Sequence, residues 1–398
     1  TSFETITAAN ATFIAGHLGS LAATTGIKTI SFNDDGDGDN IIIDAEFNNT
    51  LKINLDDGNN TLNATAYTGV LTVAVTEAIV GDAADTQMII GGTGTTDEIL
   101  LTATGSGISN AQISGVSGFE KVTIVNNAST GTIVLDDLNI DDGKALTFDA
   151  SAITTTSNTF ALNAEDEKDG ILVVIGSSGA NTITMSGSDK GDSITLGGVD
   201  DVVRVATENL TSEDTISGGV GADIIKMIDA STVSDADFTK ITSIEKIIQE
   251  NSSHNMTLTL GAKAFAAGIA KVDLGSGTNR VTSVDGYTGA LEVNLSSGKD
   301  IIDASAQPSG SLTISVAQGS ITSDDTLKGG SATDILKITA GGTALTSADV
   351  AGISAFDQIK ILMSVVKVVL LSQVNKLLMH LFSLVHVKNS KNDSSELG

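Results

Sequence analysis

The chain of 398 residues has no cysteine, no tryptophan, a single proline and only 3% aromatic residues. Without cysteine, no disulfide can hold the fold together. Large globular cores normally use aromatic side chains for bulk, yet hydrophobic residues still make up 40% of this chain. Because that apolar content is mostly Ile, Leu, Val and Ala, we expect a narrow core built from aliphatic layers.

Basic residues are also scarce: 21 Lys and Arg stand against 49 Asp and Glu, which gives a formal net charge of −28. A field of that sign repels nucleic acid and anionic lipid head groups, so we expect neither nucleic-acid binding nor membrane insertion. The acidic residues recur singly or in pairs beside glycine instead of in blocks. This distribution favours divalent cations as the partners that neutralise the charge.

The 42 glycines, together with many Thr, Ser, Asn and Asp residues, predict numerous tight turns. A Gly-x-Asp/Asn turn followed by alternating apolar residues recurs, for example at 179–183 and 191–194. Short strands at about 8 to 12-residue spacing fit a sandwich, a barrel or a solenoid. The low aromatic content and the regular pattern favour an all-β fold, a right-handed parallel β-solenoid or β-roll.

A second pattern, an aromatic residue or Ile followed by an acid, any residue and an aliphatic residue, recurs at long intervals. Its copies begin at Phe3, Phe119, Ile244 and Phe356, which lie 116, 125 and 112 residues apart. We therefore expect tandem solenoid repeats of roughly 110–125 residues, at 1–118, 119–243 and 244–362. The chain enters the first repeat partway, so we expect a fragment of a longer protein. Residues 363–398 are apolar and basic, and we expect a tail outside the repeats.

The best-defined motif is the nonapeptide Gly-Gly-x-Gly-x-Asp-x-aliphatic-x. Residues 218–226 match every position, and 329–337 lack one glycine. Glycine permits the positive φ of a tight turn, and Asp offers the hard oxygen that Ca²⁺ prefers. A further acid lies nine residues before the Asp of each motif, and a third pair of acids has the same spacing. The sequence thus predicts calcium ligands at Asp192, Asp201, Asp214, Gly219, Gly221, Asp223, Asp325, Gly330 and Asp334.

The densest acidic run, at 33–40, adds Asp35, Asp37 and Asp39 to the predicted calcium ligands. We expect a calcium-binding solenoid turn there, with an EF-hand loop ending at Glu46 and a solvated acidic turn as alternatives. For every degenerate copy of the turn, an Asp or Asn that only caps its own backbone stays an alternative.

The nonapeptide resembles the repeats-in-toxin family of calcium-binding parallel β-rolls. Its alternation with segments such as 117–124 (SGFEKVTI) resembles the haemolysin-like surface-layer proteins of Gram-negative bacteria, over most of 1–362. This resemblance implies type I secretion, a cell-surface location, calcium as the cofactor and self-association into an array or filament. Cell-surface polysaccharide or lipopolysaccharide is a further candidate partner.

Catalytic patterns are poor, because only four His residues exist and none stands in a Ser-His-acid or metal-binding arrangement. We therefore expect a structural extracellular protein, a calcium-ordered surface-layer subunit, and not an enzyme. Two alternatives stay open: a segment of a large secreted adhesin that binds a host or surface ligand, and a carbohydrate-active β-helix enzyme.

Overall fold

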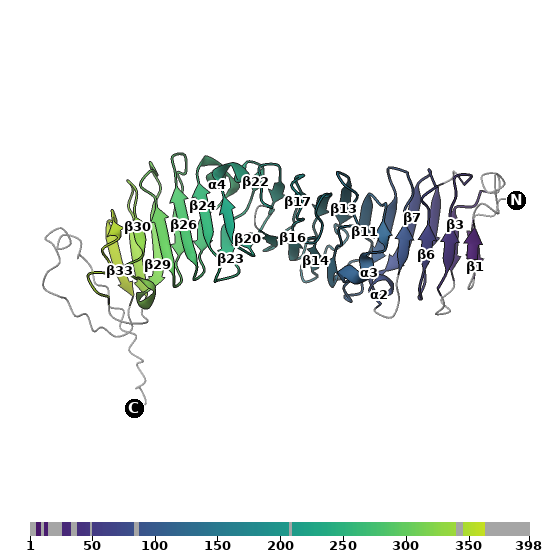
Figure 1. Cartoon of the computed structure of the whole chain (residues 1–398), viewed down its shortest axis with the longest axis horizontal. Helices are drawn as coiled ribbons and strands as arrows, with labels where there is room; N and C mark the ends of the chain where they lie inside the picture. Colours follow the sequence, from purple (N-terminus) through teal and green to yellow (C-terminus); the bar gives the residue numbers. More distant parts are fainter. Residues whose placement is uncertain are drawn as a thin grey trace, which may run out of the picture. The chain divides into compact units, whose positions relative to one another are not determined.

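Two compact units divide the chain: Thr1–Asn251 with Lys263–Ile269, and Ser252–Ala262 with Ala270–Gly398. The computed structural model describes residues 26–32, 38–47, 50–82, 87–206, 209–339 and 345–362, and the backbone alone of 5–8 and 12–14. Within each unit, parallel strands stack coil upon coil (Figure 1). The predicted all-β solenoid is confirmed, with about 14 coils over the chain.

Three parallel sheets form the first unit. The longest contains β1 (Thr5–Ala8), β3 (Thr29–Phe32), β5 (Leu51–Asn54), β7 (Leu71–Thr76), β9 (Glu98–Thr102), β11 (Lys121–Ile124), β13 (Ala145–Asp149), β15 (Ile171–Ile175), β17 (Ser193–Thr195), β19 (Thr215–Ser217) and β22 (Ile241–Thr242). A second contains β2 (Thr12–Ile14), β4 (Asn40–Ile42), β6 (Thr61–Asn63), β8 (Met88–Ile90) and β10 (Val116–Ser117). The third contains β12 (Thr132–Val134), β14 (Phe160–Asn163), β16 (Asn181–Thr184), β18 (Val202–Val205), β20 (Ile224–Met227) and β23 (Lys246–Gln249).

Two parallel runs of strands form the second unit. One contains β24 (Met256–Leu260), β26 (Thr278–Ser283), β28 (Lys299–Asp303), β30 (Thr326–Lys328) and β32 (Ile353–Ser354). The other contains β25 (Lys271–Asp273), β27 (Leu291–Asn294), β29 (Leu312–Ala317), β31 (Ile335–Thr339) and β33 (Gln358–Leu362). The remaining elements of the chain are short: α2 (Glu77–Val80), α3 (Asn110–Ile113), β21 (Ser231–Val233), η2 (Asp235–Phe238), α4 (Ala262–Ala267) and η3 (Gln318–Ser320).

The core is a set of aliphatic files that run from coil to coil, as the composition predicts. Most strands alternate buried and more exposed residues, so a strand places one to three side chains in the core. The in-register pairing of the longest sheet then stacks one buried residue on the next. One file of the first unit is Ile30, Ile53, Val73, Ile99, Val122, Phe148, Val174, Ile194, Ile216 and Ile241.

The predicted repeat motif has the same local structure at its three described copies. Residues 117–120, 242–245 and 354–357 each place a positive-φ residue before the motif's first residue. These positive-φ residues are Gly118 (73°), Ser243 (54°) and Ala355 (58°). A short strand precedes each motif, namely β10, β22 or β32. The copy at Phe3 and the tail 363–398 lie outside the described residues, and the repeat boundaries stay a prediction.

One buried glutamate of α2 fixes two neighbouring loops in the first unit. The Glu77 side chain is fully buried, and its two oxygens accept four backbone N–H groups. These donors are Thr104 (2.8 Å), Gly105 (2.8 Å), Gly107 (2.8 Å) and Gly131 (2.6 Å). Four charge-assisted hydrogen bonds offset the cost of removing this carboxylate from water.

Replacing Glu77 by Gln should therefore destabilise the first unit. The amide puts a donor where backbone donors converge, and we expect a loss of about 3 kcal/mol in unfolding free energy. Hydrogen exchange measured by mass spectrometry should show faster exchange in peptides that contain residues 104–107 and 131. Glu165→Gln, at an exposed position, is the matched control. Equal exchange in both variants would contradict this account.

Candidate functional site

Buried carboxylates and amides form a ladder that links each coil to the next. In the first unit, the backbone N–H of Asp192 donates to Oδ1 of Asp214 at 2.7 Å, and that of Asp201 to Oδ1 of Asp223 at 2.8 Å. Each pair is separated by 22 residues, which is one coil. All four side chains are at most 2% exposed. These four predicted ligands therefore lie inside the walls of the solenoid, whereas the predicted ligands Gly219 and Gly221 are exposed.

The ladder satisfies backbone groups that the sheets leave without partners. Asp201 directly precedes β18, and its carbonyl oxygen accepts the N–H of Ile224 at 3.0 Å in the regular parallel pattern. Its own N–H has no carbonyl opposite and uses the Asp223 carboxylate instead. An unpaired buried N–H would cost about as much as a lost hydrogen bond, so the acid before each strand stabilises the stacking of coils.

The ladder also joins the two sequence motifs of the repeat. The repeat motif that begins after a positive-φ residue carries an acid at its second position. That acid accepts the backbone N–H of the Asp of a glycine-rich turn, which lies 22 or 23 residues earlier. The pairs are Asp97 with Glu120 (2.8 Å), Asp223 with Glu245 (2.7 Å) and Asp334 with Asp357 (2.8 Å). The nonapeptide and the motif that follows it are therefore two halves of one intercoil contact.

The acids spaced nine residues apart do not come together. Asp214 precedes β19 and Asp223 precedes β20, which belong to different sheets. Asp325 and Asp334 precede β30 and β31, which likewise lie in different runs of strands. The residues that meet are those one coil apart, because the coil, and not the nine-residue spacing, brings turns into contact.

Five of the predicted Asp ligands already have hydrogen-bond donors on both carboxylate oxygens. The second oxygen of each accepts a backbone N–H from its own turn, three to six residues upstream. These donors are Ser186 for Asp192 (2.9 Å), Gly197 for Asp201 (3.1 Å), Thr211 for Asp214 (2.6 Å), Thr322 for Asp325 (2.8 Å) and Gly330 for Asp334 (2.5 Å). These carboxylates have the geometry of turn caps, and calcium binding by them stays a prediction.

Asp223, in the turn that matches the nonapeptide fully, is the exception among these predicted ligands. Its Oδ1 accepts the Asp201 N–H, but its buried Oδ2 has no hydrogen-bond partner within the described residues. The conformation of the nonapeptide's second glycine explains why Oδ2 has no donor. Gly330 donates to Asp334, whereas the equivalent Gly219 has a φ of +97° and makes no such bond to Asp223 among the described contacts. This turn therefore buries a carboxylate oxygen that a cation could satisfy.

Negative charge gathers around Asp223. Burial, followed by the nearby charges of Asp201, Glu245 and Asp200, raises the pKa of Asp223 to about 6. A raised pKa means that the buried anion is poorly stabilised by the protein alone. A divalent cation would relieve this repulsion, since it supplies the positive charge that the turn lacks.

The glycines of this turn are required by close backbone approach. A Cβ on Gly218 would overlap the Ser243 carbonyl oxygen and lie 2.6 Å from Oδ2 of Asp223. A Cβ on Gly219 would overlap the Gly197 carbonyl oxygen, and one on Gly221 would lie 2.6 Å from that of Val199. Carbonyl oxygens of neighbouring coils thus lie close to the turn, and carbonyl oxygens are ligands that calcium binds.

Where asparagine replaces the acid, the turn is satisfied without any charge. The Asn181 side-chain amide donates to the Gly179 carbonyl at 2.9 Å, while its oxygen accepts the Ser177 N–H at 2.8 Å. The fully buried Asn60 similarly donates to the Gly58 carbonyl at 3.1 Å and accepts the Asp39 N–H at 3.2 Å. An amide can do both because it carries a donor and an acceptor.

The acidic run is only partly described. Asp35 and Asp37 lie outside the described residues, so their predicted role stays a prediction. Asp39 is 2% exposed and directly precedes β4. The EF-hand alternative is wrong, because β4 and turn residues follow the acidic run through residue 47 where an EF-hand needs an exiting helix.

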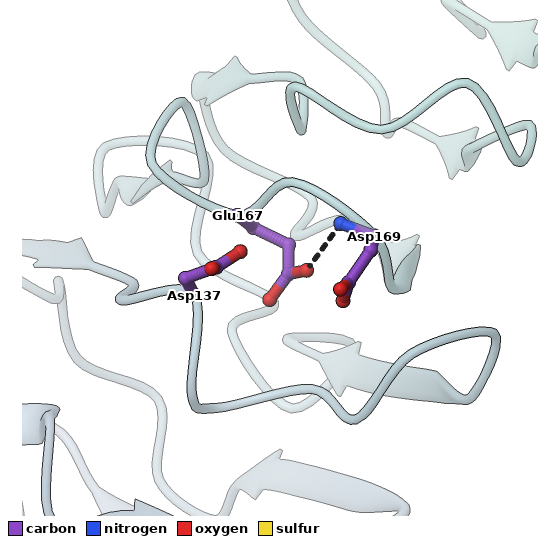
Figure 2. A group of neighbouring side chains, drawn as sticks. All are labelled: Asp137, Glu167 and Asp169. Carbon is purple, nitrogen blue, oxygen red and sulfur yellow. Dashed lines mark hydrogen bonds between the residues drawn. The ribbon is translucent and has the colours of Figure 1, made fainter.

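Sequence reasoning missed one acidic group. Among the described residues, only Asp137, Glu167 and Asp169 form a group of three carboxylates in which one oxygen of each lies within 4.8 Å of the others. Figure 2 shows the three side chains converging from two turns. Glu167 stands at a turn position equivalent to Tyr67 and Tyr287, and that comparison could have identified it.

No protein-family model, curated protein or solved structure matches this chain. Over the part of the chain that the structure describes, no helix is long and apolar enough to span a membrane.

Buried acids of the ladder should make stability depend on pH. Burial, with a smaller contribution from the charge of Asp325, raises the pKa of Asp300 to about 7 from its ordinary 3.8. The folded state therefore holds this proton more tightly than the unfolded chain, and the stability it contributes is lost as the pH rises from about 4 to about 7. In chelator, Asp300→Asn should flatten the fall of the thermal midpoint over that range.

Asp285→Asn is the control for this measurement, because Asp285 is exposed in the same unit. Calorimetry at several pH values compares the two variants with the parent chain. An Asp300→Asn profile as steep as that of Asp285→Asn would show that Asp300 is not the source of the dependence.

Proposed function

We propose that this chain is a structural, calcium-ordered extracellular protein, a subunit that self-associates into a bacterial surface layer. The observation that carries the proposal is the buried, donor-less Oδ2 of Asp223, in the turn that matches the calcium nonapeptide at every position. The parallel solenoid and the net charge of −28 support it, because both suit a repetitive scaffold whose charge needs cations.

The chain's own residues prepare the Asp223 turn. Its glycines let backbone carbonyls approach, and the Asp201 N–H holds the carboxylate through Oδ1. When bound, calcium supplies a hard divalent charge to an oxygen that has no donor. Because the unfolded chain lacks this arrangement, calcium binding adds directly to folding stability.

Calcium acts at selected turns and not in every coil. The other predicted ligands of the ladder have backbone donors on both oxygens, so their coils are held together without an ion. Unneutralised acids disfavour the calcium-sensitive turn in the calcium-poor cytoplasm, which keeps the chain open for export. Calcium outside the cell then completes the fold and orders the contacts between subunits.

A calcium titration tests this function in the full chain. Adding millimolar calcium should sharpen the β signal in circular dichroism and produce large assemblies in sedimentation, and a chelator should reverse both. Ordered arrays in electron micrographs would separate a surface-layer subunit from an adhesin segment or a β-helix enzyme. If neither the circular dichroism spectrum nor the sedimentation of the chain changes with calcium, the proposal is refuted.

Asp223→Asn and Asp214→Asn form a matched pair that tests the assignment of the site. The first removes the donor-less oxygen, so the calcium affinity should fall by about tenfold or more. The second alters a carboxylate whose oxygens both accept N–H groups. It should lower the thermal midpoint equally with and without calcium. The same loss of affinity in both variants would contradict the special role of Asp223.

A further inference from the structure

The acidic group of Asp137, Glu167 and Asp169, here called the acidic triad, spans two successive coils of the first unit. Asp137 lies in the turn after β12, while Glu167 and Asp169 lie in the turn between β14 and β15. Their carboxylates point toward one another (Figure 2). Asp137 is exposed, Asp169 is half-buried and Glu167 is buried, so the triad runs from the surface into the wall.

Glu167 brings an oxygen without a hydrogen-bond donor into the triad. Its side chain is 0% exposed, and its Oε1 accepts the N–H groups of Gly170 at 2.8 Å and Asp169 at 3.1 Å. Its Oε2 is buried and has no hydrogen-bond partner among the described residues. Burial, with added repulsion from Asp137 and Asp169, raises the pKa of Glu167. The site therefore holds a buried anion without enough positive charge.

The fold does not need a carboxylate at this turn position. Equivalent turns directly follow a strand, and in each of them the same backbone N–H donates to the carbonyl three residues earlier and belongs to a residue with a buried side chain. These side chains are Phe47, Tyr67, Ile153, Tyr287 and Gln307. None of them is charged. A glutamate at this position is thus a departure from the structural pattern, and it coincides with the place where two further carboxylates gather.

No basic side chain pairs with the triad among the described residues. Lys168 directly follows Glu167, but its Nζ donates to the carbonyl oxygen of Glu165 at 2.8 Å. Lys190 contacts Asp142 at 3.9 Å. No described basic side chain therefore balances the charge of the three converging carboxylates.

We propose that the acidic triad binds one calcium ion. Calcium–oxygen distances of about 2.3–2.6 Å place two ligands of one ion at most about 5 Å apart. One oxygen from each carboxylate of the triad lies within 4.8 Å of the other two. Magnesium demands shorter distances and a strict octahedron. The exposed side at Asp137 leaves room for water to complete the six to eight oxygens that calcium takes.

An ion held in this way ties Asp137 to Glu167 and Asp169, which lie 30 and 32 positions later on the neighbouring coil. The backbone N–H of Lys168 already donates to Oδ1 of Asp137 at 2.9 Å, so the two turns are in register before any ion arrives. The triad uses no nonapeptide residue. Its occupation is therefore separate from the proposed function of the Asp223 turn.

Calorimetric titration of the full chain with calcium chloride tests the site. Glu167→Gln should reduce the number of bound calcium ions by one, while Glu165→Gln, the same change at an exposed position two residues away, should leave it unchanged. In calcium, Glu167→Gln should melt below the parent chain. In chelator it should melt at or above the parent chain, because a buried charge has been removed.

The double variant Asp137→Asn with Asp169→Asn is a second test that leaves Glu167 in place, should Glu167→Gln fail to fold. It should weaken this one site by about tenfold or more. The titrations are repeated with Asp223→Asn as the parent chain. If adding Glu167→Gln to that chain removes one further calcium ion, the triad is independent of the nonapeptide. Equal calcium stoichiometry and affinity in Glu167→Gln and Glu165→Gln, or in the double variant and the parent chain, would overturn the proposal.

Discussion

Hydrogen bonds from the backbone of one coil to a buried side chain of the next are the contacts on which the stacking of this solenoid depends. The residue before a strand has an N–H that the parallel ladder does not reach, and the carboxylate or amide one coil later accepts it. The Asp201–Asp223–Glu245 series shows two consecutive steps. A side chain too short or lacking an acceptor would leave that N–H buried and unpaired, which is why Asp, Asn, Glu and Gln recur there.

The choice between an amide and a carboxylate at these positions has an electrostatic consequence. Asn181 satisfies its own turn as donor and acceptor, and it stays neutral. Asp must find donors for both oxygens, and where the turn geometry withholds one, as at Gly219 and Asp223, a buried anion remains. The same imbalance arises at Glu167, where a carboxylate stands in a turn position that elsewhere holds Tyr, Phe, Ile or Gln. Charge that the coils cannot balance internally makes stability depend on pH, and in our proposal it is balanced by calcium.

Sequence reasoning predicted the all-β solenoid and the aliphatic core, because periodic turns and the lack of large aromatic residues leave few other architectures. It also placed the acid of each turn directly before a strand, as at Asp192, Asp214 and Asp334. It could not predict which acids meet. The nine-residue spacing suggested pairs such as Asp214 with Asp223, but the coil of this protein is 22 residues long there, so Asp223 meets Asp201.

The sequence by itself determined that acids and glycines alternate with short apolar strands, and hence that carboxylates lie at the turns of a coiled β structure. Only the tertiary structure decided which of those carboxylates have donors. Whether a carboxylate oxygen has an N–H donor depends on the φ of a single glycine, as at Gly219. It also depends on which turn of the neighbouring coil lies beside the carboxylate. The glycine conformation and the neighbouring turn both follow from the length of each coil and the packing of its neighbours, so no single sequence motif specifies them. The convergence of Asp137 with Glu167 and Asp169 across two coils arises for the same reason.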